Sequence, residues 1–345
     1  MKVAVLNNCV PFMQGGAEHL AEALTAKLSE YGHQALLIRL PFRWEPPTKI
    51  LDHMLACRLM RLPNVDRAIA LKFPAYCVPH PNKVLWLLHQ FRQAYDLWGT
   101  QYQCLPDSAD GRQIRGAIVC GDTSYLLDAK KIFANSRVTS DRLRKFNGIE
   151  SEVLYPPLLC ESAFHSVEYG DYIFCPGRIN AAKRQRLLVE SMKHSQSGVR
   201  LVVAGRTETA SDSEAIESLI RAFRLENKVQ FVDRFITEAE KVEWFSRSLA
   251  CAYIPYDEDS YGYVTLESYH SKKAVITCAD SGGVDILVKD GVTGRVVPPE
   301  PRAVAQAMDE LFMDRQKTRR MGEAGYELVR NLHISWDRVI ECLTK

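Results

Sequence analysis

The chain has 345 residues, and no run of apolar residues in it approaches the length of a membrane span. The nearest, KVLWLLH at 83–89, has the length of a strand. Its ten cysteines form no Cys-x-x-Cys pair or regular ladder, which disfavours a zinc site or a disulfide framework. We therefore expect reduced thiols in a cytoplasmic protein, buried at strand-like runs that contain Cys120, Cys175, Cys251 and Cys278. The formal net charge of only +2 argues against a dedicated nucleic-acid-binding protein.

Two sets of short apolar runs are present instead, separated by segments of helical length. The runs lack polar alternation, which is typical of strands buried on both faces of a parallel sheet. The first set is KVAVLNN, QALLIRL, RAIALKF, KVLWLLH, GAIVCG and KIFANS, and the second is DYIFCPG, VRLVVAGR, KVQFVDRF, ACAYIPY, KAVITC and GRVVPP. The sequence thus predicts an α/β protein with two doubly wound, Rossmann-like domains. We place them at 1–165 and 166–330, and expect a helix in 331–345 to pack back on the first.

Ligands of doubly wound sheets bind outside the carboxyl ends of the strands, so the residues that follow the strands matter most. Gly15 and Gly16 follow the first strand and precede a helix that we expect to start at Ala17. Backbone N–H groups in such a loop can bind an anion, although a plain tight turn accounts for the two glycines equally well. The segment is not Gly-x-Gly-x-x-Gly, and no acid ends the second strand, which disfavours a nicotinamide-dependent enzyme.

Arg178 and Lys183 follow a strand that we expect to end at Pro176. A planar guanidinium and a mobile ammonium group can together bind a diphosphate. The alternative is a solvated basic helix start, which the neighbouring Arg184 and Arg186 favour. Because positive charge opposes the dipole at a helix N-terminus, we expect an anion here and favour the diphosphate.

The stretch YDEDSYGYVTLE at 256–267 places three acids before a glycine turn and Glu267 on a helix. Asp257 and Asp259 could hold a metal ion bound to a nucleoside diphosphate. Alternatively, Asp259 and Glu267 could accept hydrogen bonds from sugar and ribose hydroxyls with no metal, or the acids could form a solvated loop. Thr265 could contact phosphate or cap the helix, and Glu267 would also interact favourably with the helix dipole.

Four patterns in this order and spacing together resemble glycosyltransferase family 4. They are GGAE at 15–18, PGRI at 176–179 with a lysine five residues after the arginine, an acid separated from Glu267 by seven residues, and DSGG at 280–283 followed by DILVKDGVTGRVVPPEP. The resemblance covers the second half of the chain and the first strand and turn of the first half. It implies the GT-B fold, in which two Rossmann-like domains face each other across a cleft.

The resemblance assigns the donor diphosphate to Arg178 and Lys183, the ribose to Glu267 and the sugar to Asp259. His89, at the end of the strand at 83–89, matches the family's histidine near the transferred sugar. The residues predicted as catalytic are therefore Arg178, Lys183, Asp259 and His89. Those predicted to bind the donor are Gly15, Gly16, Ser260, Tyr261, Gly262, Tyr263, Val264, Thr265 and Glu267. The family usually has Glu at the position of Asp259 and FGL in place of YGY at 261–263, which bears on the choice of sugar.

The activity implied by the resemblance is retaining transfer of a hexosyl group from a nucleoside diphosphate sugar, with a UDP-sugar favoured. The acceptor would be a saccharide or lipid-linked saccharide in glycan or polysaccharide biosynthesis. Because Arg178 and Lys183 supply positive charge, we expect no metal and no cofactor, and interpret Asp257 and Glu258 as loop acids. The rival hypotheses are another GT-B activity, such as a nucleotide-sugar epimerase or a phosphorylase, and a nucleotide-binding module without catalysis.

The first half of the chain is the more basic one. Residues 1–160 carry 19 Lys and Arg against 14 Asp and Glu, and a basic segment runs from Lys130 to Lys145. Such a balance favours an anionic acceptor and peripheral contact with the inner face of a membrane, with a solvated basic helix as the alternative.

Overall fold

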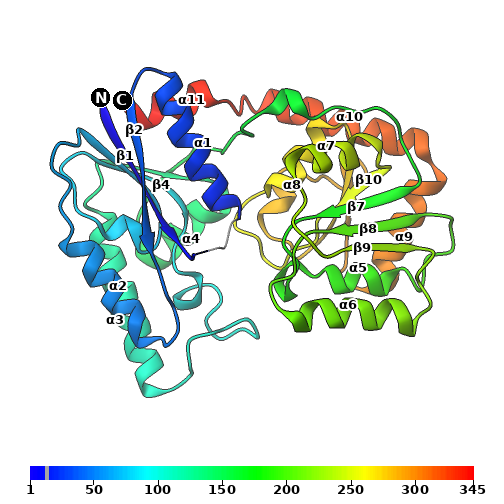
Figure 1. The fold of residues 1–345 in the computed structure, drawn as a ribbon, viewed down its shortest axis with the longest axis horizontal. Helices are drawn as coiled ribbons and strands as arrows, with labels where there is room; N and C mark the ends of the chain where they lie inside the picture. The colour runs from blue at the N-terminus through cyan, green and yellow to red at the C-terminus, as the bar shows by residue number, and fades with distance from the viewer. Residues whose placement is uncertain (12–14) are drawn as a thin grey trace. The chain divides into compact units, whose positions relative to one another are not determined.

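In the computed structural model, which describes residues 1–11 and 15–345, the chain folds into two compact units (Figure 1). Unit 1 comprises residues 1–159 and 334–345, and unit 2 comprises residues 160–333. Each unit contains a six-stranded sheet in which all paired strands are parallel. The predicted pair of doubly wound α/β folds is confirmed.

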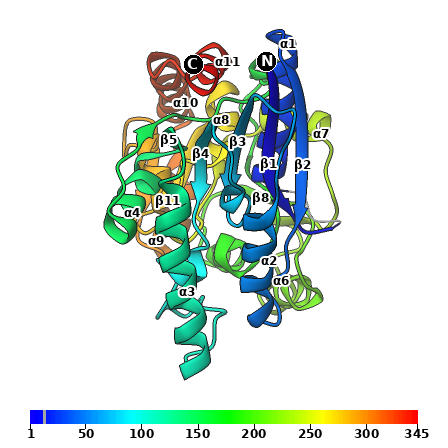
Figure 2. The same ribbon diagram turned by 90° about the vertical axis from the view of Figure 1, so that its left-hand side faces the viewer.

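The sheet of unit 1 has the strand order β2-β1-β3-β4-β5-β6. Its strands are β1 (Lys2–Cys9), β2 (Gln34–Pro41), β3 (Arg67–Lys72), β4 (Lys83–His89), β5 (Lys131–Ala134) and β6 (Glu152–Val153). Its helices are α1 (Gly16–Glu30), α2 (Thr48–Leu59), α3 (Ala109–Leu126), α4 (Arg137–Asn147) and α11 (Trp336–Thr344). Because side chains alternate along a strand, Ala4 and Leu6 share one face, where they join a core with residues of α2, α3 and α4. Figure 2 shows α2 and α3 side by side on this sheet.

The C-terminal helix α11 belongs to unit 1. The indole of Trp336 donates a hydrogen bond to the carbonyl oxygen of Leu158 at 2.8 Å, and its ring packs edge-on against Trp86 at 6.3 Å between centroids. The guanidinium of Arg67 donates to the carbonyl oxygen of Leu343 at 2.9 Å. The contacts with Arg67 and Trp86 tie the end of the chain to the strands β3 and β4.

One predicted strand is wrong: GAIVCG at 116–121 lies inside α3. Ser108 caps this helix by accepting a hydrogen bond from the backbone N–H of Gly111, and Ile114 and Ile118 are buried one turn apart. The apolar run is therefore part of a helical stripe, and β6 provides the sixth strand. Cys120, which we expected to be buried, is exposed, whereas Cys175, Cys251 and Cys278 are buried free thiols as predicted.

The sheet of unit 2 has the strand order β12-β11-β10-β7-β8-β9. Its strands are β7 (Tyr172–Pro176), β8 (Arg200–Ala204), β9 (Val229–Val232), β10 (Ala250–Ala252), β11 (Ala274–Cys278) and β12 (Gly294–Val297). Its helices are α5 (Gln185–Ser191), α6 (Ala210–Ala222), α7 (Glu238–Arg247), α8 (Tyr263–His270), α9 (Pro301–Met313) and α10 (Arg315–Asn331). Each of the six apolar runs predicted for this half contains one of these strands.

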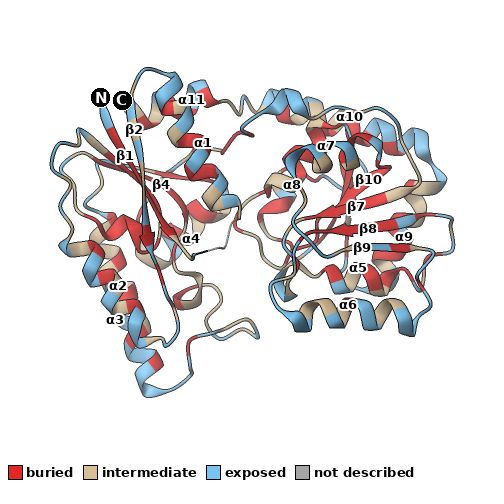
Figure 3. Ribbon diagram, viewed as in Figure 1, coloured by how far each residue is buried: buried red, intermediate tan, exposed pale blue. Residues whose placement is uncertain are grey.

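The two faces of the unit 2 sheet are covered by different helices. Ile173 and Cys175 of β7 join a core that includes residues of α5, α6 and α9. Phe174, between them, points to the other face, where it stacks on Trp244 of α7 at 5.8 Å and meets Phe245 edge-on at 5.0 Å. Figure 3 shows the strands of this sheet as largely buried, as expected for strands packed on both faces.

Within residues 1–11 and 15–345, no helix combines the length and the apolar character that crossing a membrane requires.

A buried carboxyl group lies under the helices of unit 1. Asp122 of α3 is fully buried and accepts a hydrogen bond from the Tyr95 hydroxyl at 2.8 Å. Burial raises the pKa of this carboxyl to about 7, although hydrogen bonds from tyrosine hydroxyls act in the opposite direction. Asn147, at the end of α4, donates to the Tyr95 hydroxyl at 3.3 Å and to Thr123 at 2.8 Å, so the group joins α3 and α4.

This raised pKa predicts how stability depends on pH. Because the folded state binds the proton more tightly than the unfolded state, the contribution of Asp122 is complete at acid pH and is lost as pH rises through about 7. The free energy of unfolding of the wild type, relative to that of Asp122→Asn, is expected to fall by on the order of 3 kcal/mol between about pH 4 and pH 8. Urea unfolding of both proteins across this range tests it, and a difference that is constant with pH would contradict it.

Candidate functional site

The predicted donor residues of unit 2 follow two neighbouring strands. Arg178 and Lys183 come after β7, and the segment 255–262 comes after β10, which pairs with β7. The strand order changes direction between these two strands, because β7 continues to β8 on one side and β10 to β11 on the other. In doubly wound sheets the crevice at such a switch point is where ligands bind. The sequence thus placed its main candidates at the expected edge of the sheet.

Lys183 forms a partly buried ion pair with the segment after β10. Its ammonium group contacts the carboxylate of Glu258 and donates to the hydroxyl of Tyr253 at 2.9 Å, while Tyr253 donates to Glu258 at 2.8 Å. Burial raises the pKa of Glu258, but the charge of Lys183 and hydrogen bonds with Asp259, Lys183 and Tyr253 outweigh it and lower the pKa to about 2. The site therefore holds an ionised carboxylate against the lysine predicted to bind a diphosphate.

The interpretation of Glu258 as a solvated loop acid is wrong. Its backbone N–H donates to the carbonyl oxygen of Ser281 at 3.1 Å, and its own carbonyl oxygen accepts from Gly283 at 2.8 Å. Gly282 has φ of +63°, and a side chain there would place Cβ 2.4 Å from that carbonyl oxygen. The glycine pair of DSGG thus lets the loop after β11 lie against the loop that carries Glu258.

Arg184, which we associated with a solvated helix start, instead connects three strand ends. Its guanidinium makes two 2.8 Å hydrogen bonds to the carboxylate of Asp280 after β11. It also donates to the carbonyl oxygens of Ile254 at 2.7 Å and Pro255 at 2.8 Å, after β10. Planar, bidentate pairing of this kind is what arginine provides and lysine does not. Sequence reasoning missed this role because the partner lies far along the chain.

Arg178 is held more loosely than its neighbours. Its side chain is 44% exposed, and its Nε lies 3.8 Å from the carboxylate of Glu208. The carboxylate of Glu208 accepts a shorter hydrogen bond, 2.7 Å, from the side chain of Asn180. The structure therefore places Arg178 beside the strand end with a solvent-facing guanidinium.

The turn into α8 is tightly packed. Gly262, with φ of +71°, precedes the helix, and a Cβ there would lie 2.3 Å from the ring of Tyr253. Asp259 and Tyr261 are buried in the same turn, and Ser260, Tyr263 and Val264 flank them with partial exposure. Thr265 is fully buried, and its hydroxyl has no hydrogen-bond partner among the described residues. A buried hydroxyl without a protein partner needs an explanation, and a bound ligand is one that this position allows.

Glu267 lies in the second turn of α8 and is also ion-paired. Its carboxylate accepts a hydrogen bond from the ammonium group of Lys241 of α7 at 2.6 Å, and Lys241 also pairs with Glu238 at 2.9 Å. The side chain of Glu267 is only 7% exposed. No sequence motif pointed to Lys241, because a single lysine on a helix carries no signal of its own.

In unit 1 the predicted residues lie at the carboxyl ends of β1 and β4. Gly15 directly precedes α1 and Gly16 is its first residue, one position earlier than predicted. His89 ends β4, and its Nδ1 lies 2.6 Å from the carbonyl oxygen of Gln90. If Nδ1 carries the proton, this hydrogen bond leaves Nε2 as the basic nitrogen of the ring.

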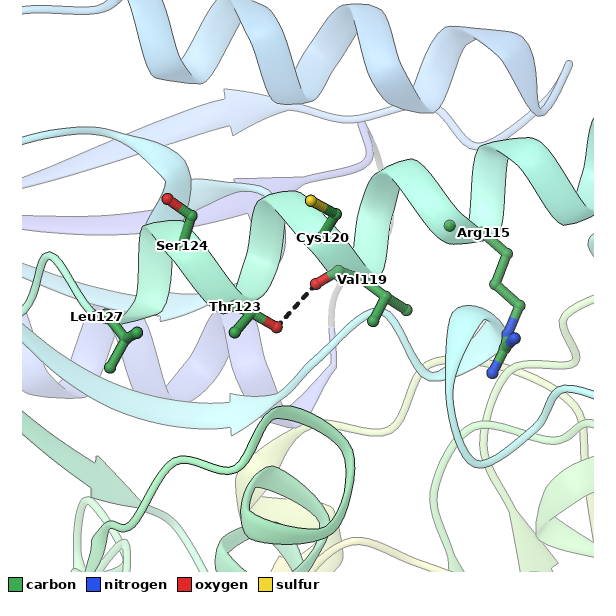
Figure 4. Close-up of a pocket in the computed structure, with 7 residues that line it drawn as sticks. Arg115, Val119, Cys120, Thr123, Ser124 and Leu127 are labelled. Carbon is green, nitrogen blue, oxygen red and sulfur yellow. Dashed lines mark hydrogen bonds between the residues drawn. The ribbon is translucent and has the colours of Figure 1, made fainter.

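One surface hollow, of about 570 Å³, lies along α3 (Figure 4). It is lined by Arg115, Gly116, Val119, Cys120, Thr123, Ser124 and Leu127. None of the residues predicted to bind a substrate is among them. Within the described residues, no group of three or more His, Cys, Asp or Glu side chains is arranged to hold a metal ion.

Comparison with protein families identifies the second half of the chain. Residues 164–328 match the family model of the glycosyl transferases group 1. This segment, which makes up most of unit 2, belongs to that family. No curated protein matches the sequence.

Solved glycosyltransferase structures resemble the whole chain. Sucrose-phosphate synthase from Thermosynechococcus elongatus has a TM-score of 0.79 at 17% identity, covering 100% of this chain and 98% of that one. HepE from Anabaena, in complex with UDP and glucose, has a TM-score of 0.72 at 16% identity, covering 100% and 99%. WaaG, a glycosyltransferase involved in lipopolysaccharide biosynthesis, has a TM-score of 0.72 at 12% identity and covers 100% of both chains. The chain therefore has the GT-B fold of this family, as the resemblance implied.

The contacts of Arg184 predict that its removal destabilises the folded protein. Arg184→Met removes the cation that joins the ends of β10 and β11 and leaves the carboxylate of Asp280 unpaired. We expect it to lower the free energy of unfolding by about 1–2 kcal/mol, because Asp280 is partly exposed and water can hydrate the unpaired carboxylate. Arg186→Met, two residues away and exposed, serves as the matched control and should change it by less than about 0.5 kcal/mol. Equal stabilities of the two variants in urea unfolding would show that Arg184 is not a structural connection.

Proposed function

We propose that this protein is a retaining hexosyltransferase that moves a sugar from a nucleoside diphosphate sugar, preferably a UDP-sugar, to a hydroxyl of a saccharide or lipid-linked saccharide. The observation that carries the proposal is the pairing of Lys183 with the ionised Glu258 at the switch point of the unit 2 sheet. A lysine there that already binds one anion can exchange it for a diphosphate. HepE, a neighbour of the same fold, has been solved with UDP and glucose and with UDP-glucose, which supports the choice of donor.

The chemistry asked of these residues is charge stabilisation. The bond between the anomeric carbon and the leaving phosphate oxygen breaks, and the acceptor oxygen forms the new bond on the same face of the sugar. The acceptor proton passes to the leaving phosphate oxygen, and the nucleoside diphosphate departs. Lys183 and Arg178 stabilise the negative charge that develops on the diphosphate, which is the largest electrostatic demand of the reaction.

The remaining predicted residues position the donor. Glu267 accepts hydrogen bonds from the ribose hydroxyls, and Asp259 does the same for the sugar. The Thr265 hydroxyl, at the start of α8 and without a protein partner among the described residues, suits a phosphate oxygen, which the helix N-terminus also favours. Gly15, Gly16 and His89 of unit 1 are proposed to contact the diphosphate and the transferred sugar, and unit 1 to bind the acceptor.

We also propose what the reaction requires and where it takes place. The positive charge of Arg178 and Lys183 takes the place of a metal ion, so we propose that the reaction needs neither metal nor cofactor. WaaG is named as acting in lipopolysaccharide biosynthesis, which supports a role in glycan or polysaccharide assembly. We further propose a cytoplasmic enzyme that contacts the inner face of the membrane through its basic first half.

A panel of nucleotide sugars tests the function directly. Purified protein incubated with UDP-, GDP- and ADP-sugars, with EDTA in one arm and Mg²⁺ in another, should release the nucleoside diphosphate from one donor class in both arms. Arg178→Ala and Lys183→Ala should each lower kcat/KM at least about a hundredfold, because each removes a charge from the leaving group. Full activity in either variant would contradict the diphosphate assignment, and loss of activity in EDTA alone would restore the metal hypothesis.

The same panel separates the rival functions. A non-catalytic nucleotide-binding module would give binding heat without release of the diphosphate, and an epimerase would change the sugar without releasing it. A phosphorylase would depend on inorganic phosphate. Release of nucleoside diphosphate that increases with a saccharide acceptor distinguishes a glycosyltransferase from all three.

Removing the negative charge of Glu258 is predicted to strengthen the binding of a nucleoside diphosphate. Glu258→Gln keeps the size of the side chain but removes the negative charge next to Lys183, so a nucleoside diphosphate no longer competes with an internal anion. We expect UDP to bind about tenfold more tightly, as measured by calorimetry. Asp257→Asn removes the same charge from the adjacent position without unpairing Lys183 and should change the affinity by less than about twofold. Weaker binding in Glu258→Gln would show that Glu258 orients Lys183 instead of competing for it.

A further inference from the structure

The ion pair between Lys241 and Glu267 joins two helices on one face of the unit 2 sheet. Lys241 lies one turn into α7, which Thr237 caps by accepting a hydrogen bond from the backbone N–H of Glu240. Its ammonium group reaches across to α8 and donates to Glu267 at 2.6 Å. The two side chains are only 16% and 7% exposed.

A lysine at this position is unfavourable unless it has a partner. Positive charge near the start of a helix opposes the helix dipole, and burial disfavours an ammonium ion. Burial lowers the pKa of Lys241, but the charges of Glu267 and Glu238 and their hydrogen bonds outweigh it, and the pKa is raised. Lys241 is therefore charged, and its hydrogen bond holds the carboxylate of Glu267 in a fixed position.

Glu238 and Glu267 are unequal partners of Lys241. Glu238, three residues before Lys241 on the same helix, is 70% exposed, and such surface pairs contribute little. Glu267 is the buried partner, on the helix whose start follows the turn of Asp259 and Gly262. The buried pair with Glu267, and not the surface pair with Glu238, explains how a lysine is accommodated at position 241.

We propose that Lys241 is a positioning residue that fixes Glu267 as an ionised ribose acceptor and thereby makes the site select ribonucleotides over 2′-deoxyribonucleotides. This inference rests on the proposed function, in which Glu267 binds the ribose of the donor. A carboxylate offers about four lone-pair directions. Lys241 takes one on Oε1 and keeps the carboxylate ionised, so that vicinal hydroxyls can donate to it. Without the lysine, Glu267 would lose the positive charge beside it, and burial disfavours the ionised form that accepts hydrogen bonds best.

A purely structural ion pair would give a different result. Removing it would lower stability and weaken the binding of every nucleotide by the same factor. A positioning role instead predicts that the affinity for the ribonucleotide falls while the affinity for its 2′-deoxy form changes little. The ratio of the two dissociation constants separates these cases, because it cancels any loss of folded protein.

The test compares UDP with 2′-deoxy-UDP, or the GDP or ADP pair if that base binds more tightly to the full-length protein. The wild type should prefer the ribonucleotide by about tenfold, the usual effect of one hydrogen bond to a charged group. In Lys241→Met the preference should fall to within about twofold, and Lys241→Arg should restore most of it. Glu238→Gln, which removes only the exposed partner, is the matched control and should keep the wild-type ratio. If Lys241→Met does not fold, Lys241→Gln removes the same charge and carries the same expectation.

An unchanged ratio in Lys241→Met or Lys241→Gln would overturn the inference. Glu267→Gln separates this failure from that of the proposed function. If Glu267→Gln abolishes the ribose preference while the Lys241 variants keep it, the ribose site stands and only the role of Lys241 is wrong. If Glu267→Gln also keeps the wild-type affinity and ratio, the ribose assignment itself is wrong and both proposals fall.

Discussion

The site depends on three cations near the strand ends of unit 2 that are each paired with a carboxylate. Arg184 pairs with Asp280, Lys183 with Glu258 and Lys241 with Glu267, and each pair joins segments that follow different strands or helices. Removing charges from water costs several kcal/mol per ion, so such pairs add little net stability over apolar contacts. Their retention is better explained by what they arrange, which is positive charge held ready at a ligand-binding edge.

The three pairs differ in how easily a ligand could replace the carboxylate. Arg184 makes four hydrogen bonds to Asp280 and to the carbonyl oxygens of Ile254 and Pro255, so it is fixed. Lys183 has a flexible stem and two partners, and a diphosphate can offer it the same kind of oxygen that Glu258 does. In our proposal the pair of Arg184 and Asp280 holds the strand ends together. Lys183 exchanges Glu258 for the substrate diphosphate, and Lys241 positions the carboxylate of Glu267 for the ribose.

Prediction of the fold from the sequence succeeded where local patterns decide the structure, and it failed where they do not. Buried parallel strands are continuous apolar runs, so all six runs of the second half were found. GAIVCG was mistaken for a strand because a short apolar run within a helix looks the same until Ile114 and Ile118 are seen to share a face. The positions of Arg178 and Lys183 after β7 followed from spacing. The roles of Arg184, Glu258 and Lys241 could not, because each depends on a partner that only the folded sheet brings near. The raised pKa of Asp122 likewise depends on burial, which only the folded structure creates.

The central claim is that Lys183 exchanges Glu258 for the diphosphate of the donor. A crystal structure of the protein with the nucleoside diphosphate that it binds most tightly tests this most directly. Our account predicts phosphate oxygens within hydrogen-bond distance, about 2.7–3.2 Å, of the Lys183 ammonium group, with the Glu258 carboxylate no longer in contact with it. A bound nucleotide whose phosphates lie elsewhere, with the pair of Lys183 and Glu258 intact, would contradict it.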